Sequence, residues 1–239
     1  MLVENGEWIM QGLSRRDPKC IRTPQALERY VQEVGFLPLF SNRVPGFSVE
    51  EHTAAEGWWS GEKEDPWSWR EELTREGKVL YGKFFGKKAG YVSAEWFPAF
   101  ANLRRDGYDF DALWDDEKAS RRQKKIMDLF GEDTEMFSFE VKEAAGFGKG
   151  GEKNFEGVIT ELQMMSYLCV RDFRQKKNRQ GQAYGWAVAV YTKPEHLIGY
   201  DHVSSCYKET REESEARIIE HLKKCFGAEA ERELKRIIG

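Results

Sequence analysis

The residues whose chemistry is easiest to assign are basic and lie between Lys142 and Arg179. Eight lysines and arginines against five acids give this stretch a charge of +3, in a chain whose net charge is -4. A local excess of cations attracts the phosphate groups of nucleic acids. The eight are Lys142, Lys149, Lys153, Arg171, Arg174, Lys176, Lys177 and Arg179.

The pattern around these cations predicts three helices followed by a β-hairpin. The third helix is marked by apolar residues at spacings of three and four, which fall on one helix face: Phe155, Val158, Ile159, Leu162 and Met165. The other predicted elements are helices over 118–130 and 137–146, the second capped by Ser138, and strands over 167–173 and 184–191 around a basic turn at 174–181. This order is typical of a winged helix, a variant of the helix-turn-helix.

A winged helix places its third helix in the major groove and its hairpin against phosphates or the minor groove. We therefore expect duplex DNA to contact the hairpin and the start of the third helix. The expected DNA-binding residues are Lys149, Lys153, Asn154, Arg171, Arg174, Lys176, Lys177 and Arg179. Glu156 and Glu161 on the same helix would be repelled by phosphate, so a solvated turn without DNA contact remains the alternative.

Composition limits the class of protein. Charged residues make up 33% and hydrophobic residues 40% of the 239, as in ordinary globular domains. No apolar run approaches the length of a membrane span, and the N-terminal residues lack the pattern of a signal peptide. The four cysteines are scattered singly, which favours reduced thiols in a cytoplasmic protein over disulfides or zinc. We expect a cytoplasmic α+β protein that uses neither a metal nor a cofactor.

Other patterns indicate chemistry less well. His52, His196, His202 and His221 do not share a metal-ligand spacing, and the glycines of 146–151 lack the Lys-Ser/Thr ending of a phosphate loop. A group of aromatic residues could line a pocket that stacks a base, although a core role is the simpler interpretation. This group is Trp67, Trp69, Phe84, Phe85, Tyr91, Trp96 and Phe97.

The flanking segments divide the chain into an N-terminal helix and strand region over 1–116, the winged helix over 117–193 and a helical extension over 194–239, which can pack as one body. Thr23 and Pro24 predict the start of a helix that ends at Gly35. Two amphipathic helices around Gly227 close the chain and offer a face for a homodimer. The sequence shows no internal repeat.

The N-terminal half resembles a known family in two segments. The first runs from Thr23-Pro-Gln-Ala-Leu through Val34-Gly-Phe-Leu-Pro-Leu-Phe40 to His52, and the second runs over 83–98 and ends in Glu-Trp-Phe-Pro98. Together with the predicted winged helix they resemble the winged-helix DNA glycosylases of the AlkZ/YcaQ type over 23–195. The resemblance implies winged-helix units that grip duplex DNA, and enzymes that excise alkylated bases or unhook crosslinks without a metal.

The chain departs from that family at its catalytic motif. The family places Gln-x-Gln or Gln-x-Asp where this sequence has Pro38 and Phe40. Neither side chain can accept a proton or orient water, so the family's usual chemistry is not expected here. Glu50, Glu51 and His52 are close enough in sequence to serve as replacements. A DNA-binding protein without base excision is the favoured interpretation, and a glycosylase with unusual residues or a winged-helix protein-interaction module are the alternatives.

Overall fold

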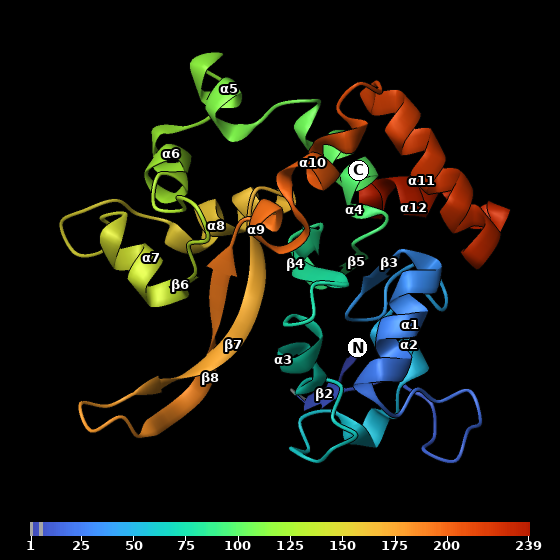
Figure 1. Cartoon of the computed structure of the whole chain (residues 1–239). Coiled ribbons are helices and arrows are strands. Elements are labelled where there is room, and N and C mark those ends of the chain that lie inside the picture. The colour runs from blue at the N-terminus through green and yellow to red at the C-terminus, as the bar shows by residue number, and fades with distance from the viewer. Residues whose placement is uncertain (1, 5–6) are drawn as a thin grey trace.

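A six-stranded antiparallel sheet forms the centre of the protein, shown by a computed structural model that describes residues 2–4 and 7–239, with side chains from Ile9 onward. The strand order is β3-β5-β4-β7-β8-β6 (Figure 1). The strands are β3 Phe36–Pro38, β4 Val79–Phe85, β5 Lys88–Ser93, β6 Met136–Phe137, β7 Cys169–Lys177 and β8 Ala183–Thr192. A separate pair, β1 Leu2–Glu4 and β2 Glu7–Ile9, lies near the N-terminus.

Helices surround this sheet, and the fold is therefore mixed α+β. The α-helices are α1 Pro24–Val34, α2 Val49–His52, α3 Trp69–Leu73, α4 Phe97–Arg105, α5 Phe110–Asp115, α6 Arg121–Met127, α7 Ser138–Ala144, α8 Phe155–Met164, α9 Pro194–Ile198, α10 Tyr200–Val203, α11 Arg211–Phe226 and α12 Glu231–Ile238. The 3₁₀ helices are η1 Ala55–Gly57, η2 Ser204–Cys206 and η3 Ala228–Ala230. In the part of the chain that the structure describes, no helix has the length and apolarity needed to cross a membrane.

Local signals place several helix ends where the sequence predicts them. Thr23 accepts a hydrogen bond from the amide of Ala26 at the start of α1, and Gly35 ends that helix with a φ of 79°. The predicted cap at Ser138 is wrong, because this serine is the first helical residue of α7 and Phe137 is the N-cap. There the carboxylate of Glu140 accepts from the amide of Phe137 instead.

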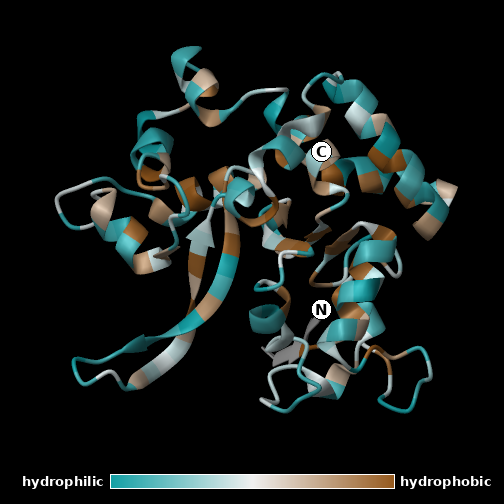
Figure 2. Ribbon diagram, in the orientation of Figure 1, coloured by the Kyte–Doolittle hydropathy of each residue, from teal (hydrophilic) through white to brown (hydrophobic). Residues whose placement is uncertain are grey.

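The hairpin of β7 and β8 is longer than predicted. Residues 174–177, expected in a turn, continue strand β7, because Arg174 pairs with Val188 and Lys176 with Tyr184 across the ladder. The connection is shortened to 178–182. The paired strands extend away from the sheet as an arm (Figure 1), whose root mixes hydrophobic and hydrophilic residues and whose outer half is largely hydrophilic (Figure 2).

The same order of elements occurs twice. A helix, a short strand, two helices and a hairpin follow one another from α1 to β5 and again from α6 to β8, with η1 added in the first unit. In each unit the short strand pairs with the second hairpin strand, β3 with β5 and β6 with β8. The first strands of the two hairpins, β4 and β7, pair at Tyr81 and Val170, so the two units contribute their strands to the sheet in the same order, counted from either edge. The sheet therefore spans the boundary predicted at residue 116 between the N-terminal region and the winged helix. The repetition is one of topology that the sequence does not display.

Aromatic side chains fill the space between the sheet and the helices. Phe36, Phe84 and Phe97 all contact the ring of Phe100, and all four are fully buried. Most of the aromatic group predicted as core is indeed buried or packed against it, which supports the simpler interpretation of those residues. Trp67 and Trp96 are half-buried, and of the two Trp67 also lines a groove described below.

The C-terminal helices pack against the same chain. Asn102 of α4 donates hydrogen bonds to the carbonyl of Glu209 (3.0 Å) and to the hydroxyl of Ser214 (2.9 Å). Arg104 donates to the carbonyl of Gly239 and to that of Phe84 in β4. The apolar faces of α11 and α12 are thereby buried; they comprise Ile218, Ile219, Leu222, Leu234 and Ile238.

A buried arginine links α4 to the segments that follow the hairpin. The guanidinium of Arg105 donates to Glu195 (2.5 Å), to the hydroxyl of Tyr207 (2.8 Å) and to the carbonyl of Ser166 (2.6 Å). Burial lowers the pKa of Arg105, but Glu195 and Tyr207 raise it more, so the guanidinium stays charged. Removing its counter-charge would leave a buried cation without compensation.

We expect Glu195→Gln to lower the free energy of unfolding by about 3 kcal/mol, as measured by urea denaturation. Glu220→Gln is the matched control, because Glu220 forms an exposed ion pair with Lys223 on α11. The control should leave the denaturation midpoint unchanged. Equal effects of the two substitutions would contradict a special role for the buried pair.

Candidate nucleic-acid interface

A groove of about 1550 Å³ separates the hairpin arm from α3. Its walls combine aromatic rings with charged side chains from both hairpin strands, from α3 and from α7. They include Trp67, Arg70, Glu71, Arg75, Phe137, Phe139, Glu140, Asp172, Phe173, Arg174, Gln175, Lys176, Lys177, Tyr184 and Trp186. Three parts of the chain that are far apart in sequence, 67–75, 137–140 and the hairpin, therefore meet on one surface.

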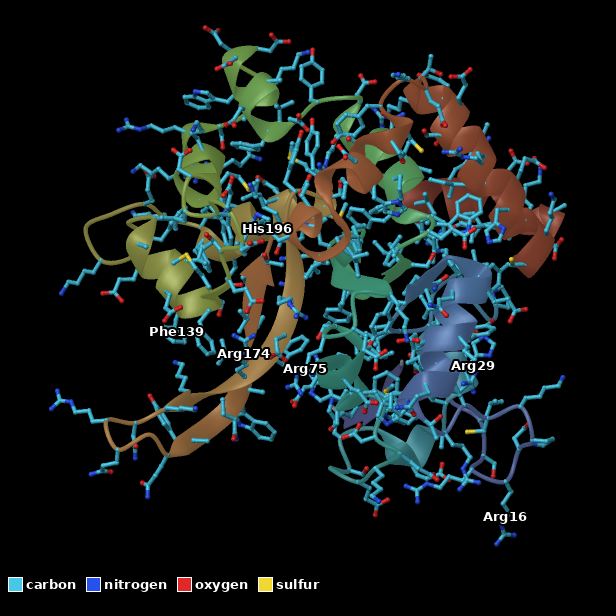
Figure 3. The ribbon with its side chains drawn as sticks, viewed as in Figure 1. Arg16, Arg29, Arg75, Phe139, Arg174 and His196 are labelled. Atoms are coloured by element: carbon cyan, nitrogen blue, oxygen red, sulfur yellow. The ribbon has the colours of Figure 1, made fainter. Side chains whose placement is uncertain are left out.

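An ion-pair cluster lies at the root of the arm and lines this groove. Asp172 accepts from Arg75 (2.9 Å) and from Arg174 (2.6 Å), and Figure 3 shows these two arginines beside each other. Burial raises the pKa of Asp172, but the hydrogen bonds from Arg174 and Arg75 lower it on balance, so the carboxylate stays ionised. Arg75 directly follows Thr74, the C-cap of α3. The cluster therefore connects the end of α3 to β7.

Two of the predicted DNA-binding residues belong to that cluster. Arg171 pairs with Glu135 (3.0 Å) and donates to the carbonyls of Thr74 and Arg75. Arg174 pairs with Glu135 (2.8 Å) as well as with Asp172. Three guanidinium groups thus meet two carboxylates, and the cluster keeps one net positive charge. The charges of these two arginines are therefore largely engaged in contacts within the protein and are less available to a ligand.

The outer half of the arm is different. Lys176 lies 4.5 Å above the ring of Phe139 on α7. Lys177 and Arg179 are exposed, and neither has an ion pair with any residue that the structure describes. Tyr184 and Trp186 on β8 are 52% and 91% exposed. Cations and exposed aromatic rings therefore lie near one another on the outer half of the arm.

The remaining predicted residues lie elsewhere. Lys149 is in the loop between α7 and α8, and Lys153 and Asn154 stand at the start of α8, with Asn154 at a φ of 66°. All three are exposed, and none of them lines the groove. The eight predicted residues therefore form two separate groups, one on the arm and one at the start of α8.

Sequence reasoning missed Arg70. Its guanidinium lies 3.3 Å from the ring centre of Trp67 and 4.4 Å from that of Phe173, and its Nε donates to the carbonyl of Trp67 (2.6 Å). No acid described in the structure forms an ion pair with it. The available signal was the aromatic run around Trp67, for which a stacking pocket was the alternative to the favoured core role, and no cation was expected inside it.

The positions of the family's catalytic motif are structural in this chain. Pro38 pairs with Gly90 at the edge strand β3, and the ring of Phe40 packs 5.5 Å from that of Trp58. Neither lines the groove.

The residues suggested as catalytic replacements, Glu50, Glu51 and His52, also form hydrogen bonds with neighbouring groups of the protein. Glu50 is buried and accepts from the amides of Gln11 and Ser41 (both 2.8 Å); burial raises its pKa, but these bonds lower it on balance. Glu51 accepts from the hydroxyl of Ser48 and the amide of Gly46. His52 lies 2.7 Å from the carbonyl of Gly46 and 2.9 Å from the hydroxyl of Tyr30.

None of these three side chains faces the groove beside the arm. Within the described residues, no group of three or more histidines, cysteines or acids is arranged to hold a metal ion.

Comparison with known proteins gives one match. A family model described as AlkZ related matches residues 21–239, which is most of the chain. No curated protein and no solved structure matches.

The ion-pair cluster predicts a pH dependence. A carboxylate with a lower pKa in the folded than in the unfolded chain adds stability above its unfolded pKa and loses it as the pH falls through the folded pKa. For Asp172 the ordinary value is 3.8, and the folded value is lower. We expect the unfolding free energy of the unmodified protein to fall more steeply than that of Asp172→Asn between about pH 5 and about pH 3.

Thermal denaturation over that pH range measures the difference. Asp201→Asn is the control, because Asp201 is exposed and forms no ion pair within the described residues. It should leave the slope with pH unaltered. An equally steep loss in Asp172→Asn would mean that the cluster does not hold the ionised carboxylate.

Proposed function

The chain belongs to the AlkZ-related family, and from that premise we propose that it is a DNA-binding protein, related to DNA-repair glycosylases, that binds duplex DNA without the family's usual base excision. The observation on which this rests is the hairpin arm. It extends from the sheet with exposed Lys177 and Arg179, in a chain whose net charge is -4. A local cationic arm on an acidic protein is suited to phosphate.

The topology supports a winged helix. The order α6, β6, α7, α8, β7 and β8, with β6 paired to β8, matches a helix-turn-helix followed by a wing. In this interpretation β7 and β8 form the wing, and α8 is the recognition helix. Lys149, Lys153 and Asn154 then stand where backbone amides and cations at the helix start meet phosphate.

The absence of the usual chemistry follows from Pro38 and Phe40. A pyrrolidine ring in an edge strand and a phenyl ring packed on Trp58 offer no proton acceptor and no hydrogen-bond donor from their side chains. Glu50 and Glu51 accept hydrogen bonds from the amides of Gln11, Ser41 and Gly46 and from the hydroxyl of Ser48. We accordingly place the activity of this protein in binding. Its free cysteines suit the reducing cytoplasm.

A protein-interaction module is the second candidate, because exposed tryptophan and tyrosine with neighbouring arginines are also common at protein interfaces. Trp186 and Tyr184 fit that description. The cations around them favour nucleic acid, and salt dependence distinguishes the two: affinity for DNA falls steeply with salt because phosphate binding releases counterions.

The binding test replaces Lys176, Lys177 and Arg179 with alanine together. We expect fluorescence anisotropy to show that the unmodified protein binds a plain duplex and that the triple variant binds about 10- to 100-fold more weakly at about 0.1 M salt. The slope of log affinity against log salt should become shallower by about 0.9 for each phosphate contact removed.

The control is the triple variant of Lys208, Lys224 and Arg232 to alanine. These residues are also exposed, form no ion pair within the described residues and change the net charge by the same amount. The control should bind as the unmodified protein does. Equal losses in both triple variants would reduce the effect to net charge, and no binding even at low salt would refute the proposal.

The second test concerns catalysis. Duplex DNA containing alkylated bases is incubated with the protein, and released base is measured by chromatography. We expect no release above the rate without protein, because no side chain at the motif positions can position water. Release that disappears in Glu51→Gln or His52→Gln would instead establish a glycosylase with unusual catalytic residues.

A further inference from the structure

We infer that the groove between α3 and the hairpin arm binds unpaired nucleotides, with Arg70 holding a phosphate and Trp186 stacking a base. The inference rests on the proposed function for its choice of nucleic acid. It adds the form of the strand: a duplex with a single-stranded extension is preferred over a blunt duplex. Three features of the groove lead to this conclusion.

The first feature is Arg70, a buried cation whose charge no acid balances. It is 7% exposed, lies between Trp67 and Phe173, and has no ion pair within the described residues. Its Nε donates to the carbonyl of Trp67 and its guanidinium also hydrogen-bonds to the side chain of Tyr81, but a guanidinium has more N–H donors than these two partners use, and the residue lines the groove. A guanidinium binds phosphate oxygens with a planar fork of donors.

Burial also makes this guanidinium selective. The two rings exclude water from its faces and prevent it from swinging away, so an anion that reaches it meets a fixed set of donors. An exposed, flexible cation such as Lys177 can contact the phosphates of many nucleic-acid forms. Arg70 is buried and lines the groove, so a phosphate has to enter the groove to reach it. The rigid backbone of a duplex lies outside such a recess, and a single strand can enter it.

The second feature is the concentration of exposed rings. Of the six large hydrophobic residues that are exposed in the described part of the chain, Phe139, Tyr184 and Trp186 line this one groove. Trp186, at 91% exposure, contributes little to the packing of its own fold. Bases in a duplex are already stacked on one another, but unpaired bases stack on aromatic side chains.

The third feature is the size and charge of the groove. Five cations line it (Arg70, Arg75, Arg174, Lys176 and Lys177) against three acids (Glu71, Glu140 and Asp172), which leaves two positive charges. Its volume of about 1550 Å³ is larger than the roughly 300–1000 Å³ typical of small-molecule pockets. An extended polyanion with flat bases fits these properties better than a compact ligand or a neutral peptide.

The experiment compares three probes at one salt concentration by anisotropy: a blunt duplex, the same duplex with a short thymine overhang, and the overhang strand alone. We expect the unmodified protein to bind the overhang duplex about tenfold more tightly than the blunt one, the gain that one stacked base provides. Trp186→Ala should abolish this preference, so that the overhang duplex and the blunt duplex bind with the same affinity. Trp186→Phe should retain part of the preference, because the phenyl ring still stacks.

Two further variants assign the effect to the groove. Tyr200→Ala is the control, because Tyr200 is 53% exposed but lies outside the groove; it should keep the full preference. Arg70→Lys retains the charge and loses the planar fork, and we expect it to weaken overhang binding alone. Since Arg70 is buried, the thermal stability of the Arg70→Lys variant is measured together with its DNA affinity. Trp186 is so exposed that its substitution tests the inference without affecting folding.

The outcomes separate this inference from the proposed function. Equal affinity for blunt and overhang duplexes overturns the inference and leaves duplex binding intact. Binding of the overhang strand but not of the blunt duplex supports the inference and overturns duplex binding. A preference that survives in Trp186→Ala also overturns it, and binding of none of the three probes overturns both.

Discussion

The pairing of β4 with β7 is the contact on which the rest of the molecule depends. It joins two units of the same topology at Tyr81 and Val170 and makes one sheet of six strands. Immediately beyond it, Asp172 and Arg171 of β7 bind Arg75 and the carbonyls after α3. Charge-assisted hydrogen bonds therefore connect the root of the arm to the residues after α3, and Arg75 and Asp172 of this connection also line the groove.

Local chemistry was predictable from the sequence because it depends on neighbours in the chain. The cap at Thr23, the stop at Gly35 and the apolar face of α8 are all signalled within a few residues. The extension of β7 to Lys177 was not, since a charged segment is indistinguishable from a turn until its partner strand is known. The twofold topology was invisible for the same reason: it consists of pairings, and the two units share no similar sequence.

The candidate site shows the limit of counting charges. The arm does contain the predicted cations, but Arg171 and Arg174 face Glu135, which lies more than thirty residues earlier and outside the counted stretch. Arg75 and Asp172 are 97 positions apart. Only the fold determines which cations are neutralised and which remain available. Conversely, Arg70 gains its importance from Phe173 on a distant strand, a contact that no spacing in the sequence could indicate.

The same fold explains how chemistry and binding can separate. The motif positions Pro38 and Phe40 belong to the first unit, at the edge strand and the ring of Trp58, whereas the exposed cations and rings belong mainly to the arm of the second. Substituting the former alters packing at the far edge of the sheet and leaves the arm, its ion-pair cluster and the groove in place. The function we propose, nucleic-acid binding without the positioning of water, is therefore compatible with this fold, because different strands of one sheet form the two regions.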